Sequence, residues 1–290
     1  MKRLQIILLF SLITMNSSPQ ISILKGKIQQ VIEYKNADIG VAVLDLSNGD
    51  TIAIHGERHY PMQSVFKFPI ALKVLHNVDK GKINLVDSIL IRAKDLKKDT
   101  WSPIREMHPN GNFYMSFANI IYYTIAQSDN NGCDILLRFA GGTISVNNYL
   151  RSIGIKNITI LRSEAEQHKN FNAQFYNFAT PNEAINLLQK FYENTLLKPY
   201  TQDFLMTTMT KTSTGSIKKK IPKNIQVAHK TGSAFDKAKG RFVTNDIGIM
   251  TFPNKHAIAY AIFIMNSKET PETNYDIIAD IGKVLAENYK

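Results

Sequence analysis

Ser64 and Lys67 stand three residues apart in the run Ser64-Val65-Phe66-Lys67, at the start of a stretch with helical periodicity. Residues three apart on a helix share a face, so the hydroxyl and the amine are predicted to be neighbours. A serine hydroxyl is a poor nucleophile until a base removes its proton. A lysine whose pKa is lowered by burial or by another cation can take part in that step. The pair therefore indicates nucleophilic chemistry, although the motif alone also describes a helix cap beside a surface lysine.

Two further short motifs accompany this pair. Ser128-Asp129-Asn130 follows the end of a predicted helix, where all three residue types favour a turn. Lys230-Thr231-Gly232 ends a β-type run over 225–228, and its glycine permits a close approach to a strand edge. Each motif is unremarkable alone. Together, in this order and at a helix start, a helix-to-loop junction and an edge strand, they form the set found in β-lactamases and penicillin-binding proteins.

Over nearly its whole mature length the chain resembles the class A serine β-lactamases, and within that class the VEB/PER-type branch. The resemblance rests on residues 61–69, 128–134, 227–232, 244–246 and 267–270. It implies hydrolysis of penicillins and cephalosporins, extended-spectrum ones included, with antibiotic resistance as the result and no cofactor. Two rivals remain. A penicillin-binding DD-peptidase shares the three motifs but deacylates slowly, and a β-lactam-binding sensor domain would usually carry a transmembrane signalling partner.

The resemblance also implies roles for the residues of the first two motifs. Ser64 would be the nucleophile that opens the lactam ring, and Lys67 would share in its activation. Ser128 would pass a proton to the departing ring nitrogen. Asn130 would hold Lys67 and the side-chain amide of the substrate.

The third motif would bind the other end of the substrate. Lys230, Thr231 and Ser233 would hold the substrate carboxylate, which requires a cation at this strand. The main-chain N–H groups of Ser64 and Ser233 would form the oxyanion hole, and Gly232 would allow the substrate to approach the strand edge closely. Such a donor is typically worth about 10²–10³ in rate.

Hydrolysis also needs a base that activates water against the acyl-enzyme. By the same resemblance Glu164 is that base, with Glu166 as the rival carboxylate two residues on. The family usually has asparagine four residues after the glutamate, whereas this chain has His168, which could hold the water and would add pH dependence. Trp101 is expected either to form an aromatic wall of the cleft or to be a packing residue of the helical lobe.

Residues 162–177 are expected to form an Ω-type loop that closes over the site. Many class A enzymes hold this loop with an Arg–Asp ion pair, but the aspartate position here is Asn177. Any contact of Asn177 with Arg162 would therefore be a hydrogen bond to a neutral acceptor. Cys133, the only cysteine, stands in an apolar run and is expected to be a buried structural thiol.

Hydrophobic patterning predicts the elements that must position these residues. Helices are expected over 21–34, 116–126, 134–140, 182–192 and 272–288, and strands over 38–46, 51–55, 225–229, 246–252 and 257–265. Strands at both ends therefore flank a helical middle. The predicted fold is α/β (α+β): a five-stranded antiparallel sheet built from both chain ends and flanked by helices, residues 19–58 and 206–290, with an inserted all-helical lobe at 59–205.

Composition limits the class of protein. The 290 residues are 44% hydrophobic and 20% charged, which is typical of a globular chain, and the formal net charge is +11. No Arg-rich or aromatic-interleaved stripe indicates a nucleic-acid partner, and the basic run at 218–220 is interpreted as a surface loop. His55 and His59 do not match a zinc motif, so no metal is expected. A monomer that binds β-lactam antibiotics is expected.

The first residues indicate export. Lys2 and Arg3 precede an apolar run over 4–15, followed by small polar residues, which is the pattern of a secretory signal. The run is shorter than the ~20 residues that a membrane span needs. We expect a signal peptide over 1–18, a periplasmic mature protein and no membrane association after its removal; an uncleaved anchor is the alternative.

Overall fold

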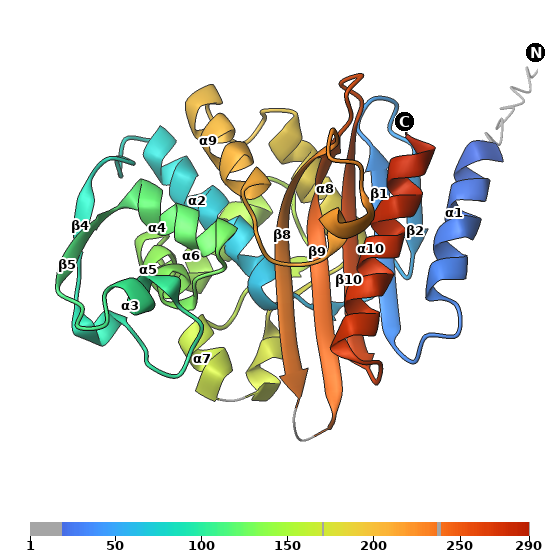
Figure 1. Ribbon diagram of the computed structural model, residues 1–290. Helices are drawn as coiled ribbons and strands as arrows, with labels where there is room; N and C mark the ends of the chain where they lie inside the picture. The colour runs from blue at the N-terminus through green and yellow to red at the C-terminus, as the bar shows by residue number, and fades with distance from the viewer. Residues whose placement is uncertain (1–18, 170, 237–238, 290) are drawn as a thin grey trace, which may run out of the picture.

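A five-stranded antiparallel sheet forms the centre of the computed structural model, which describes residues 19–169, 171–236 and 239–289. The predicted signal peptide lies outside these residues. The strand order is β2-β1-β10-β9-β8, so the two ends of the chain meet between β1 and β10 (Figure 1). This confirms the predicted fold class. The strands are β1 (Asp38–Asp45), β2 (Thr51–Ile54), β8 (Gln226–Asp236), β9 (Arg241–Thr251) and β10 (Ala257–Ser267).

Helices cover both faces of this sheet. In Figure 1 the terminal helices α1 and α10 lie on one side, and the helical middle of the chain lies on the other. The α-helices are α1 (Pro19–Ile32), α2 (Lys67–Asp79), α3 (Pro103–Met107), α4 (Phe117–Ala126), α5 (Asn130–Phe139), α6 (Gly142–Ser152), α7 (Glu164–Lys169), α8 (Pro181–Tyr192), α9 (Pro199–Thr210) and α10 (Pro271–Asn288). Short 3₁₀ helices are η1 (Gln63–Phe66), η2 (Ala93–Asp95), η3 (Phe171–Tyr176) and η4 (Ile217–Lys220).

Alternation along the central strands divides the core into two layers. On β10, Ile258, Tyr260 and Ile262 pack into the layer under α1 and α10, whereas Ala259 and Ala261 pack toward α8 and the helical middle. Successive side chains of a strand point to opposite faces, so a strand buried on both sides is apolar throughout. The small residues on the second face allow α8 to approach the sheet.

Residues 59–205 were expected to form an all-helical lobe, but they also contain two small sheets that were not predicted. One has the order β3-β7-β6 and the other pairs β4 with β5. Their strands are too short for periodicity to reveal them. They are β3 (Tyr60–Pro61), β4 (Ser88–Ile91), β5 (Phe113–Ser116), β6 (Ile158–Thr159) and β7 (Phe178–Ala179).

Three predicted boundaries were wrong by four residues or more. The strand expected from residue 246 begins at Arg241, as β9, and the other two errors bear on the site. The strand expected to end at residue 229 continues as β8 to Asp236, because its ladder with β9 runs unbroken from Gln226 to Asp236. The helix expected from residue 134 begins four residues earlier, because the Asp129 side chain caps it by accepting from Gly132 N. In the part of the chain that the structure describes, no helix has the length and apolar character of a membrane span.

Candidate active site

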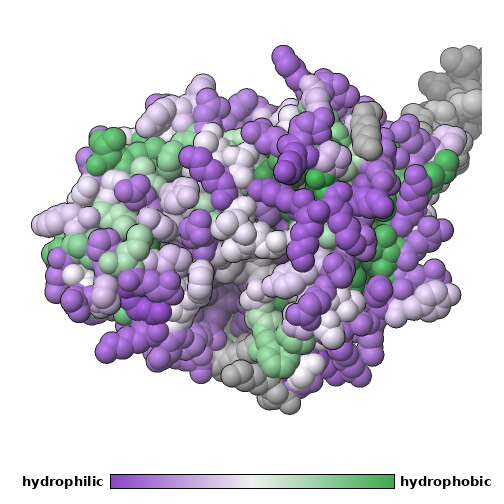
Figure 2. Space-filling model, in the orientation of Figure 1, coloured by the Kyte–Doolittle hydropathy of each residue, from purple (hydrophilic) through white to green (hydrophobic). Residues whose placement is uncertain are grey.

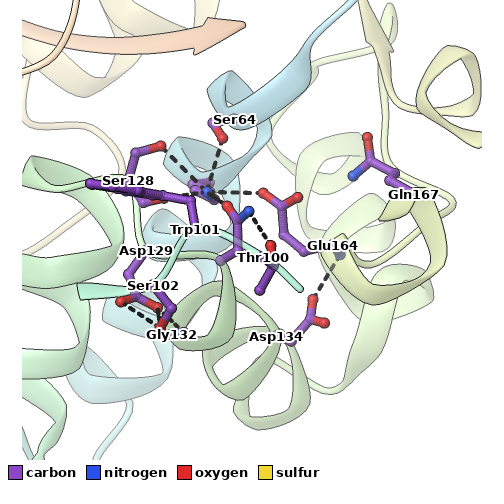
Figure 3. A network of polar contacts seen from close by, with 12 residues as sticks. Ser64, Thr100, Trp101, Ser102, Ser128, Asp129, Gly132, Asp134, Glu164 and Gln167 are labelled. Carbon is purple, nitrogen blue, oxygen red and sulfur yellow. Dashed lines mark hydrogen bonds and ion pairs between the residues drawn. The ribbon is translucent and has the colours of Figure 1, made fainter. Parts of the chain in front are cut away.

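Ser64 and Lys67 lie at the junction of η1 and α2. Ser64 is in the 3₁₀ turn and Lys67 is the first residue of α2, fully buried. The Lys67 ammonium donates to Ser64 Oγ at 2.9 Å and forms an ion pair with Glu164 Oε1 at 2.9 Å. It also donates to the Ser128 carbonyl at 2.8 Å and lies 3.3 Å from Ser128 Oγ (Figure 3). One buried amine therefore connects residues of three segments that are distant in sequence.

The Ser128-Asp129-Asn130 segment is held by its buried aspartate. Asp129 accepts from Gly132 N at 2.8 Å, Ile104 N at 2.7 Å and Ser102 Oγ at 2.9 Å. These bonds hold Ser128 in a left-handed conformation, with a φ of 57°, that few non-glycine residues adopt. Burial raises the pKa of the Asp129 carboxyl, and these hydrogen bonds oppose that rise.

Asn130, the first residue of α5, faces the amine. Its Oδ1 accepts from Lys67, and its Nδ2 donates to Thr100 Oγ1 at 2.6 Å. Its main-chain N–H donates to the Trp101 carbonyl at 3.0 Å. Trp101 itself remains 54% exposed, and its indole donates to the Gln127 carbonyl at 2.9 Å. The loop before α3 is thereby attached to the start of α5.

Lys230 enters the same cluster from β8. It is fully buried, and its ammonium donates to Ser128 Oγ at 3.0 Å and to the Thr231 carbonyl at 2.9 Å. Burial lowers the pKa of Lys230 well below its usual range, and the charge of Lys67 lowers it further. Ser128 Oγ thus lies between the two amines.

Gly232 packs against the nucleophile turn. A Cβ at this position would lie 2.6 Å from the Met62 carbonyl oxygen and 2.9 Å from Ser64 N. The glycine therefore makes room for the backbone of the nucleophile turn rather than only for a ligand at the strand edge. Thr231 Oγ1 lies 2.5 Å from Thr214 Oγ1, and Ser233 is exposed beside the cavity.

The two candidate carboxylates are separated by the fold. Glu164 points at Lys67, whereas Glu166 is exposed and its Oε2 accepts from Ser163 N at 2.8 Å. Glu166 therefore caps the start of α7, and only Glu164 joins the cluster. A short helix, α7, occupies part of the loop expected at 162–177.

Asp134 is a site residue that sequence reasoning missed. Its Oδ1 accepts from Glu164 N at 2.8 Å (Figure 3), and its Oδ2 accepts from Ala165 N at 3.0 Å. Burial raises the pKa of Asp134 to about 6, and the charge of Glu164 adds to the rise. Its position four residues after Asn130 on one helix face was the available signal.

Asn177 closes the loop through the main chain. Its Oδ1 accepts from Leu161 N at 2.8 Å and Arg162 N at 2.9 Å, and its Nδ2 donates to the Arg162 carbonyl at 2.7 Å. The Arg162 guanidinium instead lies over the Tyr176 ring, 4.9 Å from its centroid. The expected contact is therefore a set of neutral hydrogen bonds, made with the backbone of Arg162 rather than its side chain.

Two adjoining cavities open on the cluster, with volumes of about 210 Å³ and 270 Å³. Both are lined by Thr100, Asn130, Glu164 and His168, and Ser64 and Ser233 line the smaller one. On the face drawn in Figure 2 the surface is hollowed beside β8, between the helical part and the sheet, and hydrophilic residues line much of the hollow.

Cys133 and the histidines considered as metal ligands take no part in this cluster. Cys133 is fully buried, and burial raises the pKa of its thiol well above the usual range, which suits a packing residue. Within the described ranges, no group of three or more His, Cys, Asp or Glu side chains is placed to hold a metal ion.

A hydroxyl, two buried amines and a carboxylate converging on one cavity are the constellation that serine β-lactamases share. The model of the β-lactamase enzyme family matches residues 23–289, so the chain belongs to that family, and it is a class A enzyme that hydrolyses β-lactams.

Individual relatives support this membership. The β-lactamase VEB-1 of Pseudomonas aeruginosa is 42% identical over 99% of this chain and 98% of its own. The extended-spectrum β-lactamase PER-1 of Pseudomonas aeruginosa is 33% identical over 96% of this chain and 91% of its own. The crystal structure of the TLA-3 extended-spectrum β-lactamase superposes with a TM-score of 0.90 at 42% identity, covering 92% of this chain and 98% of that one. The expected class and branch are thereby confirmed.

Proposed function

We propose that the enzyme hydrolyses β-lactams through an acyl-enzyme on Ser64, which water then removes with Glu164 as the base. One observation carries the proposal. The Lys67 ammonium lies 2.9 Å from both Ser64 Oγ and Glu164 Oε1, so one amine contacts the groups needed for both half-reactions. General base catalysis requires a distance of about 2.6–3.2 Å between the base and the heavy atom that carries the proton, and the distance from Lys67 to Ser64 meets this requirement.

In acylation, Lys67 first gives a proton to Glu164, 2.9 Å away, so that its neutral amine can take the proton of Ser64 Oγ as this oxygen attacks the lactam carbonyl carbon. The carbon–nitrogen bond of the ring breaks, and the ring nitrogen takes a proton by way of Ser128 Oγ, which lies 3.3 Å from Lys67 Nζ and 3.0 Å from Lys230 Nζ. The N–H groups of Ser64 and Ser233 would stabilise the oxyanion.

Substrate binding would use the remaining predicted residues. Lys230 and Thr231 would hold the substrate carboxylate, and Asn130 would hold its side-chain amide. For Trp101 both alternatives remain: an aromatic wall of the cleft or a packing residue of the helical lobe.

Before deacylation Glu164 returns its proton to Lys67. A water molecule then attacks the ester carbonyl carbon and gives a proton to the Glu164 carboxylate. The bond from the carbonyl carbon to Ser64 Oγ breaks, Ser64 Oγ takes a proton from Lys67, and Glu164 passes its own proton back to Lys67. Asp134 fixes the backbone of Glu164, and His168 lines the same cavity, so both contribute to where the water sits.

The named relatives extend the proposal to substrate range and location. Penicillins and cephalosporins are the proposed substrates, and an extended spectrum is supported by PER-1 and TLA-3, which are both described as extended-spectrum β-lactamases. A periplasmic location is proposed from the leader expected at residues 1–18.

Mass spectrometry with a chromogenic cephalosporin tests the mechanism. Glu164→Ala is expected to accumulate a covalent adduct on Ser64, whereas Ser64→Ala forms none. Unchanged turnover in Glu164→Ala would overturn the assignment of the base. A wild-type enzyme that is acylated stoichiometrically without turnover would favour the DD-peptidase or sensor alternatives.

A further inference from the structure

A buried polar network lies behind the strand that carries Lys230. His229 Nδ1 lies 3.0 Å and 3.2 Å from the two carboxylate oxygens of Asp246, and Tyr260 OH donates to Asp246 Oδ1 at 3.0 Å. The side chains of His229 and Asp246 are each 1% exposed, and Tyr260 is fully buried. Burying a carboxylate away from water costs free energy unless the group is hydrogen-bonded or faces a cation. The burial of Asp246 must therefore be compensated by its neighbours.

The network is next to Lys230 in the ladder. Asp246 is directly opposite Thr231, and Lys230 is opposite the following residue, Ile247. Adjacent strands lie about 4.8 Å apart, so the Asp246 backbone borders that of Lys230 across a single strand spacing. A Cβ at Gly215 would lie 2.5 Å from Thr231 Cγ2 and 3.2 Å from Asp246 Oδ2, which places both side chains on the same face.

On the cleft side, the partners of the Lys230 ammonium among the described residues are the uncharged oxygens of Ser128 and Thr231. Lys67 and Lys230 are both fully buried, but the ion pair of Glu164 is with Lys67. In the described part of the chain, no carboxylate lies within ion-pair distance of Lys230. The titratable groups that act on it from the cleft are Lys67 of α2, Cys133 of α5 and Glu164 of α7.

We propose that Asp246, held by His229 and Tyr260, is a positioning residue that keeps the Lys230 ammonium charged for the substrate carboxylate. The inference rests on the proposed function, because it concerns the residue proposed to bind that carboxylate. Asp246 acts from the opposite face of β8 and contacts no substrate. Another charged group near Asp246 is Lys218 of η4, whose ammonium donates to the carbonyls of Thr210 and Thr212 at 2.9 Å and 3.1 Å.

Electrostatics gives the direction of the effect. Burial and the charge of Lys67 lower the pKa of Lys230, whereas Glu164 and Asp246 raise it. His229 Nδ1 and Tyr260 OH, each 3.0 Å from Asp246 Oδ1, hold the Asp246 carboxylate in place. Removing the Asp246 charge should therefore deprotonate Lys230 at lower pH and weaken the binding of an anionic substrate.

The test measures kcat/KM across pH for a chromogenic cephalosporin and for its methyl ester, and takes the ratio. The ratio isolates the carboxylate, because titration of Lys67 or Glu164 affects both substrates. In Asp246→Asn the basic limb of the ratio is expected to move down by about one pH unit. Above that limb KM should rise about tenfold for the acid with kcat little changed.

Two further variants separate charge from packing. Lys218→Met removes a cation on the far side of Asp246, so the basic limb is expected to move up, the opposite direction. Thr212→Val removes the 2.7 Å bond to the His229 carbonyl without changing any charge, and it should leave the limb in place.

The outcomes are decisive in either direction. The proposal would be overturned if the basic limb of the kcat/KM ratio stays in place in Asp246→Asn. It would also be overturned if this limb moves equally in Thr212→Val. In either case the network would be purely structural. If Asp246→Asn does not fold, a limb that fails to rise in Lys218→Met overturns it instead. The proposed function is tested by acylation and turnover of the wild-type enzyme. None of the results above decides that test, so the failure of one proposal can be told from the failure of the other.

Discussion

The main-chain N–H of Glu164 donates to Asp134 Oδ1 at 2.8 Å, and the next N–H of the loop donates to the other oxygen of the same carboxylate. Asp134 belongs to α5, the helix that also supplies Asn130, so the proposed deacylation base is anchored to the element that holds Lys67. Hydrogen bonds to an ionised acceptor are about twice as strong as neutral ones. The orientation of Glu164 therefore depends on a side chain that does not itself face the substrate.

Asp134→Ala is expected to loosen this anchor. Two main-chain donors lose their acceptor, so the free energy of unfolding should fall by about 2–4 kcal/mol. Deacylation should slow by about 100-fold because the base is no longer held in place. Glu166→Ala is the matched control in the same loop: it removes only an exposed cap and should cost about 1 kcal/mol with little effect on rate. Similar deacylation rates in the two variants would contradict the anchoring role.

Asp134 should also make stability depend on pH. Its folded-state pKa of about 6 exceeds the ordinary value of 3.8, so the folded protein binds more protons between these values than the unfolded chain does. The free energy of unfolding contributed by this group therefore falls as pH rises from about 4 to about 6, by at most about 3 kcal/mol.

Chemical denaturation of wild type and Asp134→Asn at several pH values measures this effect. The lost acceptor costs the same free energy at every pH. It therefore does not affect how the difference in free energy of unfolding between the two proteins changes with pH. The free energy of unfolding of Asp134→Asn should rise relative to that of wild type between pH 4 and pH 7. A difference between the two proteins that is constant over this range would show that Asp134 titrates normally.

Much of the fold was predictable because it depends on local patterns. Nearly continuous apolar runs in β1 and β10 are typical of strands buried on both faces. Ser116 caps α4 by accepting from Asn119 N, as expected. The anchors of the site were not predictable. The bond from Asn130 to Thr100 and the contact of Gln63 with Gln174 join distant segments, and periodicity carries no information about such pairs. The extension of β8 past Gly232 likewise depends on pairing with β9.

Asn177 allows a prediction about loop rigidity. The residue is fully buried and makes three hydrogen bonds to the main chain of Leu161 and Arg162. Asn177→Ala leaves all three groups unpaired, so the free energy of unfolding should fall by about 3 kcal/mol or more. Asn177→Asp keeps both acceptor bonds but sets a carboxylate against the Arg162 carbonyl, so an intermediate loss of about 1–2 kcal/mol is expected. Denaturant unfolding ranks the variants, and an Asn177→Asp protein as stable as wild type at pH 7 would show that the Arg162 guanidinium had moved in to pair with it.

Gly232→Ala tests whether the backbone of β8 must approach the nucleophile turn as closely as it does. The new Cβ would lie 2.6 Å from the Met62 carbonyl oxygen and 2.9 Å from Ser64 N, and backbone atoms cannot give way as a flexible side chain can. Overpacking of this kind typically costs about 1–3 kcal/mol. Because Ser64 N is a proposed oxyanion donor, kcat/KM should also fall by about 10²–10³.

Gly26→Ala is the control for that substitution. Gly26 is within α1, where an added Cβ meets nothing within 4 Å, so alanine should stabilise the helix by about 0.5–1 kcal/mol and leave kcat/KM unchanged. Both variants add one methyl group, so a difference in rate between them reports on where the methyl is placed. A Gly232→Ala enzyme that loses stability but keeps wild-type kcat/KM would mean that the turn can shift without moving the Ser64 donor, and the oxyanion hole would then have to be sought elsewhere in the cleft.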